Sequence, residues 1–391
     1  MSLVNSILSS FKREILEVAR DRLYMAVLIV IPVAMVLFFA VMFYRGEIED
    51  LPIAIVDHSH TQTSYKLVNM IDAMPGVAVT YIVQSTADAY RLILQGDALA
   101  MLYIPDDFEA NIYRGIPAKV ECYLLGTNIS ADGVIERDVQ QTVMTLSAGI
   151  SLNKLQSEGI GYSEALVEIT PVNIHSNIVA NPYLNYGYYL APIFMFMAVV
   201  ILTVVCTTYA IGRELRYATA TKWLEASGNS LAGALMGKLL PITIIMSLMT
   251  QFILLILIVF MGMNCAGSYL FLTVGGILFI IAYQAVAIAI VSATANLRLA
   301  LSLGGGYAVM AFTFSGITFP VSAMYEWIRP LSKLFPLSYF SDIFIDQMMI
   351  GTPLSYDIPK AISLLLFLPL IAISWRRLSR VVRDETYWRR S

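Results

Sequence analysis

Few residues in this chain have the types and spacing that chemistry at a site requires. His58 and His60 follow an apolar run at 52–56 that indicates a buried strand, and imidazole nitrogens are common zinc ligands. In α/β sheets, ligands often bind beyond the carboxyl ends of strands. No third ligand stands at a matching spacing, so the competing interpretation is a strand-to-helix turn capped by Asp57 and Ser59. We expect the turn and no metal site.

A second run has the outline of a phosphate-binding loop but not its spacing. Three residues separate Gly233 from Gly237 where such a loop needs four, and Leu239 follows Lys238 where Ser or Thr would hold Mg²⁺. No Ser-His-Asp or Cys-His order is recognisable. The three cysteines fall in different predicted environments: Cys122, Cys206 and Cys265. We therefore expect no catalytic residues, no ATP site and no cofactor in this chain.

The elements that carry these residues are mostly long and apolar. Hydrophobic residues make up 58% of the chain and charged residues 14%, and the mean hydropathy is +0.71. Crossing a bilayer core of ~30 Å takes about 20 helical residues, and six runs approach or exceed that length. They are Leu23–Tyr44, Tyr186–Ile211, Leu239–Met261, Tyr269–Val291, Leu303–Phe319 and Ala361–Trp375. The sequence predicts a polytopic α-helical membrane protein with six transmembrane helices.

Basic residues set the expected orientation, because Lys and Arg mark the cytoplasmic side of short loops. They gather before the first run, between the second and third, and after the sixth, with Arg298 between the fourth and fifth. The groups are Lys12, Arg13, Arg20 and Arg22, then Arg213, Arg216, Lys222 and Lys238, and then Arg376, Arg377, Arg380, Arg383, Arg389 and Arg390. Both termini are expected in the cytoplasm, with residues 377–391 as a basic tail.

A large insert, residues 45–183, separates the first two runs and is expected outside the cell membrane. Between Arg45 and Pro182 it holds 17 Asp and Glu against 7 Lys and Arg. Apolar and β-branched runs predict strands at 52–56, 76–83, 99–104, 119–124 and 166–174. Amphipathic spacing and helix-opening residues predict helices at 64–74, at 86–95, from 105 onward and at 132–157. Strands alternating with helices indicate an extracytoplasmic α/β domain.

The segment 212–237 is charged at its start, amphipathic in its middle and bounded by glycine and proline. Arg213 and Glu214 lead into an apolar stretch around Trp223. This pattern favours a short helix along the inner membrane face over a flexible loop. Simple anchoring is the competing explanation for Arg213, Glu214 and Lys238, since basic side chains snorkel to the interface at helix ends.

Around this segment the chain resembles an ABC-2-type ABC transporter permease, the membrane subunit of an ATP-driven exporter. The matching residues are Arg213-Glu214, Ala218-Thr219, Trp223-Leu224 and Gly237-Lys238-Leu239-Leu240-Pro241, then Phe314–Pro320, Phe335–Phe340 and Gly351. One leading span, a large insert and five trailing spans are similar as well. Two positions depart from the pattern: Gly212 stands where an acid is common, and Ala218 where glycine is usual.

The resemblance implies that 212–237 couples the chain to a separate ABC ATPase, which would bind ATP and Mg²⁺. The residues it assigns to ATPase coupling are Arg213, Glu214, Thr219, Trp223, Leu224 and Lys238. It also implies that residues 1–22 form an amphipathic, elbow-like helix on the inner leaflet. Further implied partners are a second permease subunit, identical or a sister protein, and membrane lipid, in a bacterial inner membrane. A periplasmic adaptor is another candidate partner, and we expect no nucleic acid.

Residues 320–359, between the fifth and sixth runs, are expected to form an outer re-entrant region. The candidate site residues here are Phe319, Pro320, Pro336, Tyr339 and Asp342. Aromatic rings suit the headgroup level of a membrane. Asp342 and Asp346 lie four apart on one predicted helical face, which is either a substrate exit or simply a solvated surface.

The predicted spans hold almost no ionisable residues, which argues against ion coupling and favours a hydrophobic or amphipathic cargo such as a drug, lipid or glycoconjugate. Small residues at 275–276 and 304–306 would serve either pairing of two subunits or packing within one. Two other classes stay open. One is a membrane-anchored receptor or scaffold whose outer domain senses a ligand or docks an envelope partner, and the other is a membrane enzyme with its site in the insert.

Overall fold

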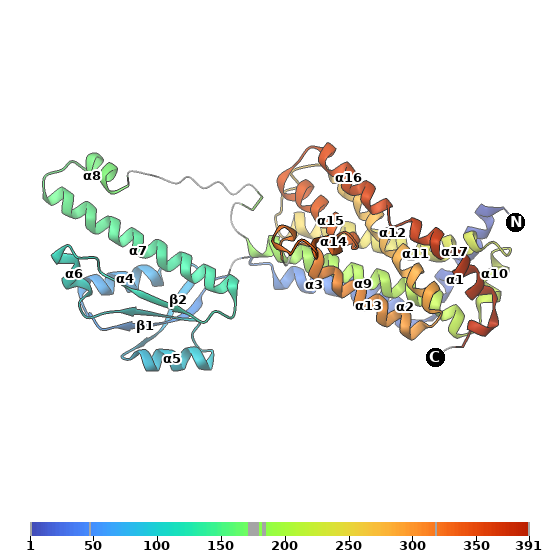
Figure 1. The fold of residues 1–391 in the computed structure, drawn as a ribbon, viewed down its shortest axis with the longest axis horizontal. Coiled ribbons are helices and arrows are strands. Elements are labelled where there is room, and N and C mark those ends of the chain that lie inside the picture. The colour runs from blue at the N-terminus through green and yellow to red at the C-terminus, as the bar shows by residue number, and fades with distance from the viewer. Residues whose placement is uncertain (1, 47, 171–179, 182–184, 317–318, 390–391) are drawn as a thin grey trace. The chain divides into compact units, whose positions relative to one another are not determined.

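The computed structural model describes residues 2–46, 48–170, 180–181, 185–316 and 319–389. The chain divides into two compact units (Figure 1). One consists of Met1–Gly46 with Ile178–Ser391, and the other of Glu47–Asn177. We call the first the helical unit and the second the α/β unit.

The α/β unit contains a four-stranded sheet in the order β2-β1-β3-β4. Its strands are β1 (Leu51–Asp57), β2 (Val77–Val83), β3 (Ala100–Ile104) and β4 (Glu121–Leu124). Its helices are α4 (Gln62–Asp72), α5 (Thr86–Gln95), α6 (Phe108–Arg114), α7 (Ile129–Ser157) and α8 (Tyr162–Ile169). β1 pairs in parallel with β2 and β3, whereas β4 runs antiparallel to β3 at the edge.

Two small cores cover the two faces of this sheet. Ile53 and Ile55 of β1 pack with α4 and α7 on one face, and Ala54 and Val56 pack with α5 on the other. A strand buried on both faces reads as a continuous apolar run, which is why β1 could be predicted. The predicted strand at 166–174 is wrong in its first part, because Leu166–Ile169 complete helix α8, and residues 171–174 lie outside the described residues.

The first helix of the helical unit is α1 (Leu3–Arg20), and the described residues of this unit form six helices that are long and apolar enough to cross a membrane. The first is formed by α2 (Arg22–Met25), a π-helical turn at Ala26–Val30 and α3 (Ile31–Met42). The others are α9 (Tyr186–Arg216), α11 (Leu231–Leu255) extended to Phe260, α12 (Tyr269–Thr294), α13 (Leu297–Phe314), and α16 (Leu354–Leu365) with α17 (Pro369–Arg383). The short helices between them are α10 (Ala220–Ala226), α14 (Arg329–Ser332) and α15 (Pro336–Phe344), which continues as a π-helix at Ile345–Ile350.

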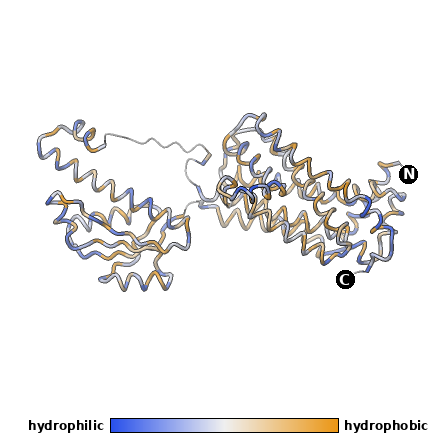
Figure 2. The backbone as a smooth tube through the Cα atoms, viewed as in Figure 1, coloured by the Kyte–Doolittle hydropathy of each residue, from blue (hydrophilic) through white to orange (hydrophobic). Residues whose placement is uncertain are grey.

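Helix α9 lies at the centre of this bundle and packs against α3, α11, α12 and α13. Most of its apolar residues are buried, whereas the other spans keep large apolar side chains exposed, including Phe38, Leu248, Val259 and Ile373. Figure 2 shows the long helices coloured mainly as hydrophobic residues. An apolar exterior of this extent is typical of helices that face lipid.

Three spans begin earlier than hydropathy predicts. α13 starts at Leu297 rather than Leu303, where Asn296 accepts a hydrogen bond from the Leu299 amide and caps the helix. α11 starts at Leu231 rather than Leu239, since Ser230 accepts a hydrogen bond from the Gly233 amide and so caps the helix. The last span starts at Leu354 rather than Ala361, so Asp357 lies within the helix, and its side chain is fully buried. Polar residues occupy the starts of these helices. A prediction based on apolar runs alone therefore placed each start too late in the chain.

Candidate functional site

The buried face of α1 is polar. Ser6, Ser10, Glu14 and Val18 are buried and lie four residues apart, so they share one side of the helix. The apolar residues lie on the remaining surface, with Leu3, Val4, Leu8, Ile15 and Leu16 exposed. This arrangement is inverted relative to a helix on a soluble core, and it suits a helix whose apolar side rests on lipid.

Two glycines of α11 allow α1 to approach closely. A Cβ atom added to Gly237 would lie 2.3 Å from the Ile7 carbonyl oxygen, and one added to Gly233 would lie 2.5 Å from the Ser6 Cβ. Glycines four apart on one helix are a common close-packing device in membranes. The run that imitated a phosphate-binding loop is therefore a helix-packing surface.

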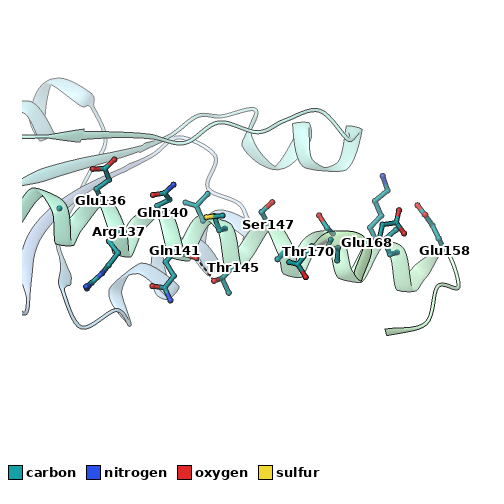
Figure 3. A pocket seen from close by; sticks show the side chains of 17 residues that line it. Glu136, Arg137, Gln140, Gln141, Thr145, Ser147, Glu158, Glu168 and Thr170 are labelled. Carbon is teal, nitrogen blue, oxygen red and sulfur yellow. Dashed lines mark hydrogen bonds between the residues drawn. The ribbon is translucent and has the colours of Figure 1, made fainter. Parts of the chain in front are cut away.

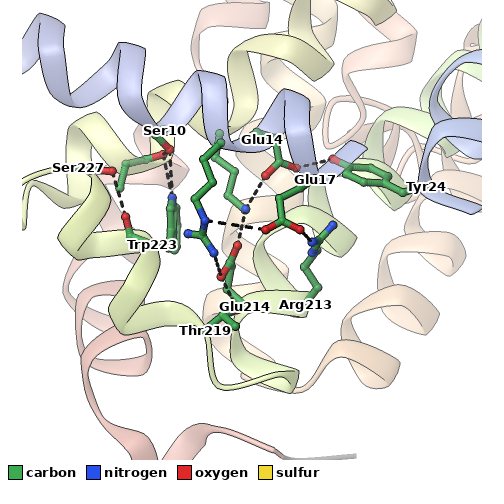
Figure 4. A network of polar contacts seen from close by, with 12 residues as sticks. Ser10, Glu14, Glu17, Tyr24, Arg213, Glu214, Thr219, Trp223 and Ser227 are labelled. Atoms are coloured by element: carbon green, nitrogen blue, oxygen red, sulfur yellow. Dashed lines mark hydrogen bonds and ion pairs between the residues drawn. The ribbon is translucent and has the colours of Figure 1, made fainter. Parts of the chain in front are cut away.

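Lys238, one residue beyond Gly237, lies at the centre of a buried charge network. Figure 4 shows this network and labels its acidic members, Glu14, Glu17 and Glu214. Its ammonium group is 2.6 Å from a carboxylate oxygen of Glu14 and 2.7 Å from one of Glu214, and all three side chains are 1% exposed. Tyr24 donates a hydrogen bond of 2.9 Å to Glu14, and Thr219 donates one to Glu214. Buried charges persist only when they are paired in this way.

A second ring of charges surrounds this centre. Arg13 donates to Glu214 at 3.0 Å, and Arg213 pairs with Glu17. The network thus contains three basic and three acidic side chains, and its formal charges cancel. The network joins α1, the end of α9 and the start of α11. Movement of one of these helices therefore strains the other two.

The turn from α9 into α10 is part of the same site. Ala218 adopts a left-handed conformation with φ of 56°, as glycine would, and the Thr219 amide bonds to the Glu214 carbonyl at 2.9 Å. Trp223 of α10 donates to the Ser10 hydroxyl at 3.1 Å, and its ring lies 5.2 Å from the Lys238 nitrogen. Although alanine stands where the family usually has glycine, the turn keeps the left-handed conformation that glycine would adopt, and the Ala218 backbone is strained as a result.

The structure separates the predicted coupling residues into two groups. Trp223 and Leu224 are buried inside the helical unit, as are Glu214 and Lys238, and Arg213 and Thr219 are half-buried. The exposed side chains of α10 are instead those of Thr221, Lys222 and Glu225. The predicted residues therefore hold α10 in place, while other residues form its outer face.

The C-terminal tail packs beside this outer face. The Arg389 amide bonds to the Leu215 carbonyl at 3.1 Å, and Trp388 donates to the Val381 carbonyl at 3.1 Å. Between α10 and the tail lies an open cavity of about 500 Å³ lined by side chains of both signs, Lys222, Glu225, Glu385 and Arg389 among them. The C-terminal tail is thus folded against the end of α9 and the outer face of α10.

A second polar cluster joins the region 320–359 to Lys360, the residue that follows it. Lys360 pairs with Asp346 and, at 2.8 Å, with Asp357, and Gln347 donates to Asp357 at 2.6 Å. Asp346 is therefore ion-paired rather than merely solvated. Asp342 is an exposed residue, but desolvation of its carboxyl by the surrounding chain raises the pKa to about 6, and Lys360 opposes this shift.

The remaining candidate residues of this region do not converge on one point. Phe319 and Pro320 are exposed, Pro336 is buried, and Tyr339 is half-buried with its hydroxyl on the Lys333 carbonyl. Pro336 opens α15, where a proline without an amide hydrogen is well suited to the first turn.

The α/β unit offers two further candidates. Asp57 accepts from the amides of Ser59 and His60 and from the Ser64 hydroxyl, which confirms the turn at Asp57. Thr61, rather than the predicted Ser59, caps helix α4. The described residues contain no group of three metal ligands. A wide groove follows α7 toward α8 and is lined mainly by polar side chains (Figure 3). Acidic, basic and amide groups alternate along it, so it carries no single chemical preference.

Sequence reasoning missed the partners that α1 contributes. Arg13 appeared only among the basic residues before the first span, and Ser10, Glu14 and Glu17 were given no role of their own. A signal existed, because Ser6, Ser10 and Glu14 recur at a spacing of four. Asp357 and Lys360 were missed because the last span was predicted to begin after them.

In the described part of the chain, six candidate spanning helices with α9 at their centre, joined at one end by a charge network, define a polytopic helical membrane protein. The chain belongs to the ABC-2 family transporter proteins, whose family model matches residues 22–376. Members of this family are permease subunits without an ATPase site of their own, and they work in general with an ABC ATPase. The chain is similar to the probable multidrug ABC transporter permease YbhR of Escherichia coli K12 and of strain O157:H7. Each is 23% identical over 301 residues, which cover 76% of this chain and 77% of the relative.

Proposed function

We propose that this chain is the permease subunit of an ATP-driven exporter and that a separate ABC ATPase docks on the outer face of α10. The cargo is a hydrophobic or amphipathic molecule, and two permease subunits act together, either as identical copies or as sister proteins. The termini and α10 face the cytoplasm, and the α/β unit lies on the opposite side. The relatives named as multidrug permeases support the choice of cargo.

The single observation that carries this proposal is the connection from α10 to the spans through Glu214. Glu214 bonds to Thr219 at the start of α10, to Lys238 in α11 and to Arg13 in α1. A force applied to α10 reaches three helices through paired charges with little freedom to rearrange. Membrane anchoring alone would not require these charges to be buried.

The docking surface consists of the exposed side chains of α10 together with the adjacent tail. Lys222, Glu225, Glu385 and Arg389 present two charges of each sign. Mixed charge at an interface fixes orientation and excludes wrong partners more than it adds affinity. This surface suits a partner with its own complementary set of charges.

Charge reversal on the outer face of α10 tests the coupling. We expect Lys222→Glu to reduce both co-purification of the ATPase and substrate-stimulated ATP hydrolysis in reconstituted vesicles. Lys333→Glu is a matched control, because Lys333 is also exposed but lies in the loop before α15. Both variants should insert and unfold like the unmodified chain.

Two results would contradict the proposal. Full ATPase coupling in Lys222→Glu, with a second reversal at Glu225 equally silent, would place the docking surface elsewhere. ATP hydrolysis by the purified chain alone would remove the need for a partner. Replacing Glu214 is a weaker test, because the loss of a buried charge destabilises the helical unit itself.

A further inference from the structure

A preformed cavity lies within the helical unit between α9 and α15, well apart in the chain from the charge network. It has a volume of about 410 Å³, within the range of small-molecule sites. Pro192 and Phe196 of α9 form one wall, and Phe340 and Phe344 of α15 form another. All of these residues belong to the same compact unit.

The aromatic walls are held in place by their own packing. The Phe196 ring meets Phe340 edge-on at 5.0 Å and Phe344 at 5.2 Å, and Phe340 stacks on Phe279 at 4.4 Å. Because these rings are 4% exposed or less, they cannot collapse into the cavity without unpacking the bundle. Edge-on contacts at such distances are favourable for aromatic groups.

The cavity provides hydrogen-bonding groups but no charge. Its lining contains Asn181, Tyr188 and Ser341, and the described residues that line it include no Asp, Glu, Lys, Arg or His. Pro192 lacks an amide hydrogen, so the Tyr188 carbonyl loses the donor that an α-helix normally supplies four residues later. A charged ligand would be desolvated here without a partner, whereas a neutral one would not.

We propose that this cavity binds a neutral molecule carrying one or two aromatic rings. The inference rests on the proposed export function, because such a molecule belongs to the hydrophobic class that we assign as cargo. It adds that binding takes place inside one subunit and requires no ATPase. Ring-lined walls and the absence of charge favour this occupant over a charged drug or a lipid headgroup.

Benzophenone is a suitable probe, since it is neutral, has two rings and inserts into nearby C–H bonds when irradiated. The purified chain in lipid nanodiscs, without the ATPase, is labelled at rising benzophenone concentration, and the modified peptides are identified by mass spectrometry. We expect saturable labelling of the cavity-lining parts of α9 and α15. Diphenylmethane should compete, and a benzophenone bearing a trimethylammonium group should neither label these peptides nor compete.

Two isoleucines of the same π-helical segment form a matched pair of variants. Ile345 lines the cavity, whereas Ile350 is exposed and does not. Ile345→Phe should fill the space and weaken saturable labelling by about tenfold. Ile350→Phe adds the same ring to the same element and should leave labelling unchanged, and both should unfold at similar temperatures.

Several outcomes overturn the inference. Labelling that does not saturate, or that is spread evenly over the lipid-facing helices, would mean simple partition into the bilayer or a cavity filled by a lipid chain. Equal labelling in Ile345→Phe and Ile350→Phe would place the probe elsewhere. If Ile345→Phe does not fold, saturation and competition in the unmodified chain decide. Because no ATPase is present, failure here leaves the proposed coupling untouched, and failure of coupling leaves this result untouched.

Discussion

Lys238 and Glu14, 224 residues apart in the chain, meet at 2.6 Å with each side chain 1% exposed. A pair of this kind connects the N-terminal helix to the span that follows α10. Since a buried charge without its partner is costly, the two helices must stay together for either charge to remain inside. The N-terminal helix is therefore a structural part of the charge network that also contains the end of α9 and the start of α11.

Removing the charge of Lys238 should destabilise the helical unit. Lys238→Met leaves Glu14 and Glu214 without their shared cation and should lower the free energy of unfolding by roughly 3–5 kcal/mol. Thermal unfolding of the purified chain in detergent micelles measures this. Lys222→Met, which removes an exposed lysine of α10, is the control and should change stability little.

Comparing Lys238→Met with Lys222→Met distinguishes the loss of a buried charge from the loss of an exposed one. A Lys238→Met midpoint equal to that of Lys222→Met would show that the network adds nothing to stability. Joint replacement of Glu14 by Gln with Lys238→Met should recover part of the loss, because one unpaired carboxylate disappears. No recovery would mean that Glu14 is not coupled to Lys238.

The close approach of α1 and α11 predicts contrasting effects of alanine at two glycines. Gly237→Ala would place a methyl group 2.3 Å from the Ile7 carbonyl oxygen and should destabilise by about 1–3 kcal/mol. Gly305→Ala, in α13, meets nothing within 4 Å and should be neutral or slightly stabilising, since alanine favours helix. Equal midpoints for the two variants would contradict the packing described here.

The spans and the first strands were predictable because their signals are local. A 26-residue apolar helix such as α12, or a buried run such as β1, shows its character in its own residues. The charge network was only half predictable, since Arg213, Glu214 and Lys238 stood out beside a family motif. Glu14 did not, because its role depends on a contact made 224 residues away.

The strained turn at Ala218 predicts a stabilising substitution. Ala218 has φ of 56°, where a Cβ atom is disfavoured, so Ala218→Gly should raise the free energy of unfolding by about 0.5–1 kcal/mol. Ala220→Gly, within α10, should instead cost about 0.5–1 kcal/mol through lost helix propensity. Thermal unfolding of the two variants side by side checks the prediction, and a lower midpoint for Ala218→Gly would refute it.

Asp342 predicts a dependence of stability on pH. Although the residue is exposed, desolvation of its carboxyl raises the pKa from 3.8 to about 6, so the fold favours the protonated form. The resulting stabilisation is present below pH 3.8 and is lost as the pH rises through about 6. Asp342→Asn should therefore raise the unfolding midpoint at pH 8 and leave it unchanged near pH 4.

A surface control keeps this measurement specific. Asp97→Asn removes an exposed carboxylate of the α/β unit. It should leave the difference between the unfolding midpoints at pH 8 and near pH 4 unchanged. If Asp342→Asn lowers the midpoint at pH 8, the carboxylate is a stabilising partner of Lys360, and its burial is not what governs its contribution.

The proposed orientation predicts which thiols a membrane-impermeant maleimide reaches. A cysteine at Tyr113, which is 82% exposed in the α/β unit, should be labelled in spheroplasts, and one at Thr221 only after permeabilisation. The natural thiol Cys122 is exposed in the same unit but is a poor reporter, because desolvation by the surrounding chain, with Glu136 nearby, raises its pKa to about 11. At neutral pH its thiolate is about 100-fold scarcer than that of a thiol with pKa 9, so its labelling should rise steeply toward alkaline pH. Labelling of Thr221→Cys in intact spheroplasts would reverse the orientation and, with it, the docking of a cytoplasmic ATPase on α10.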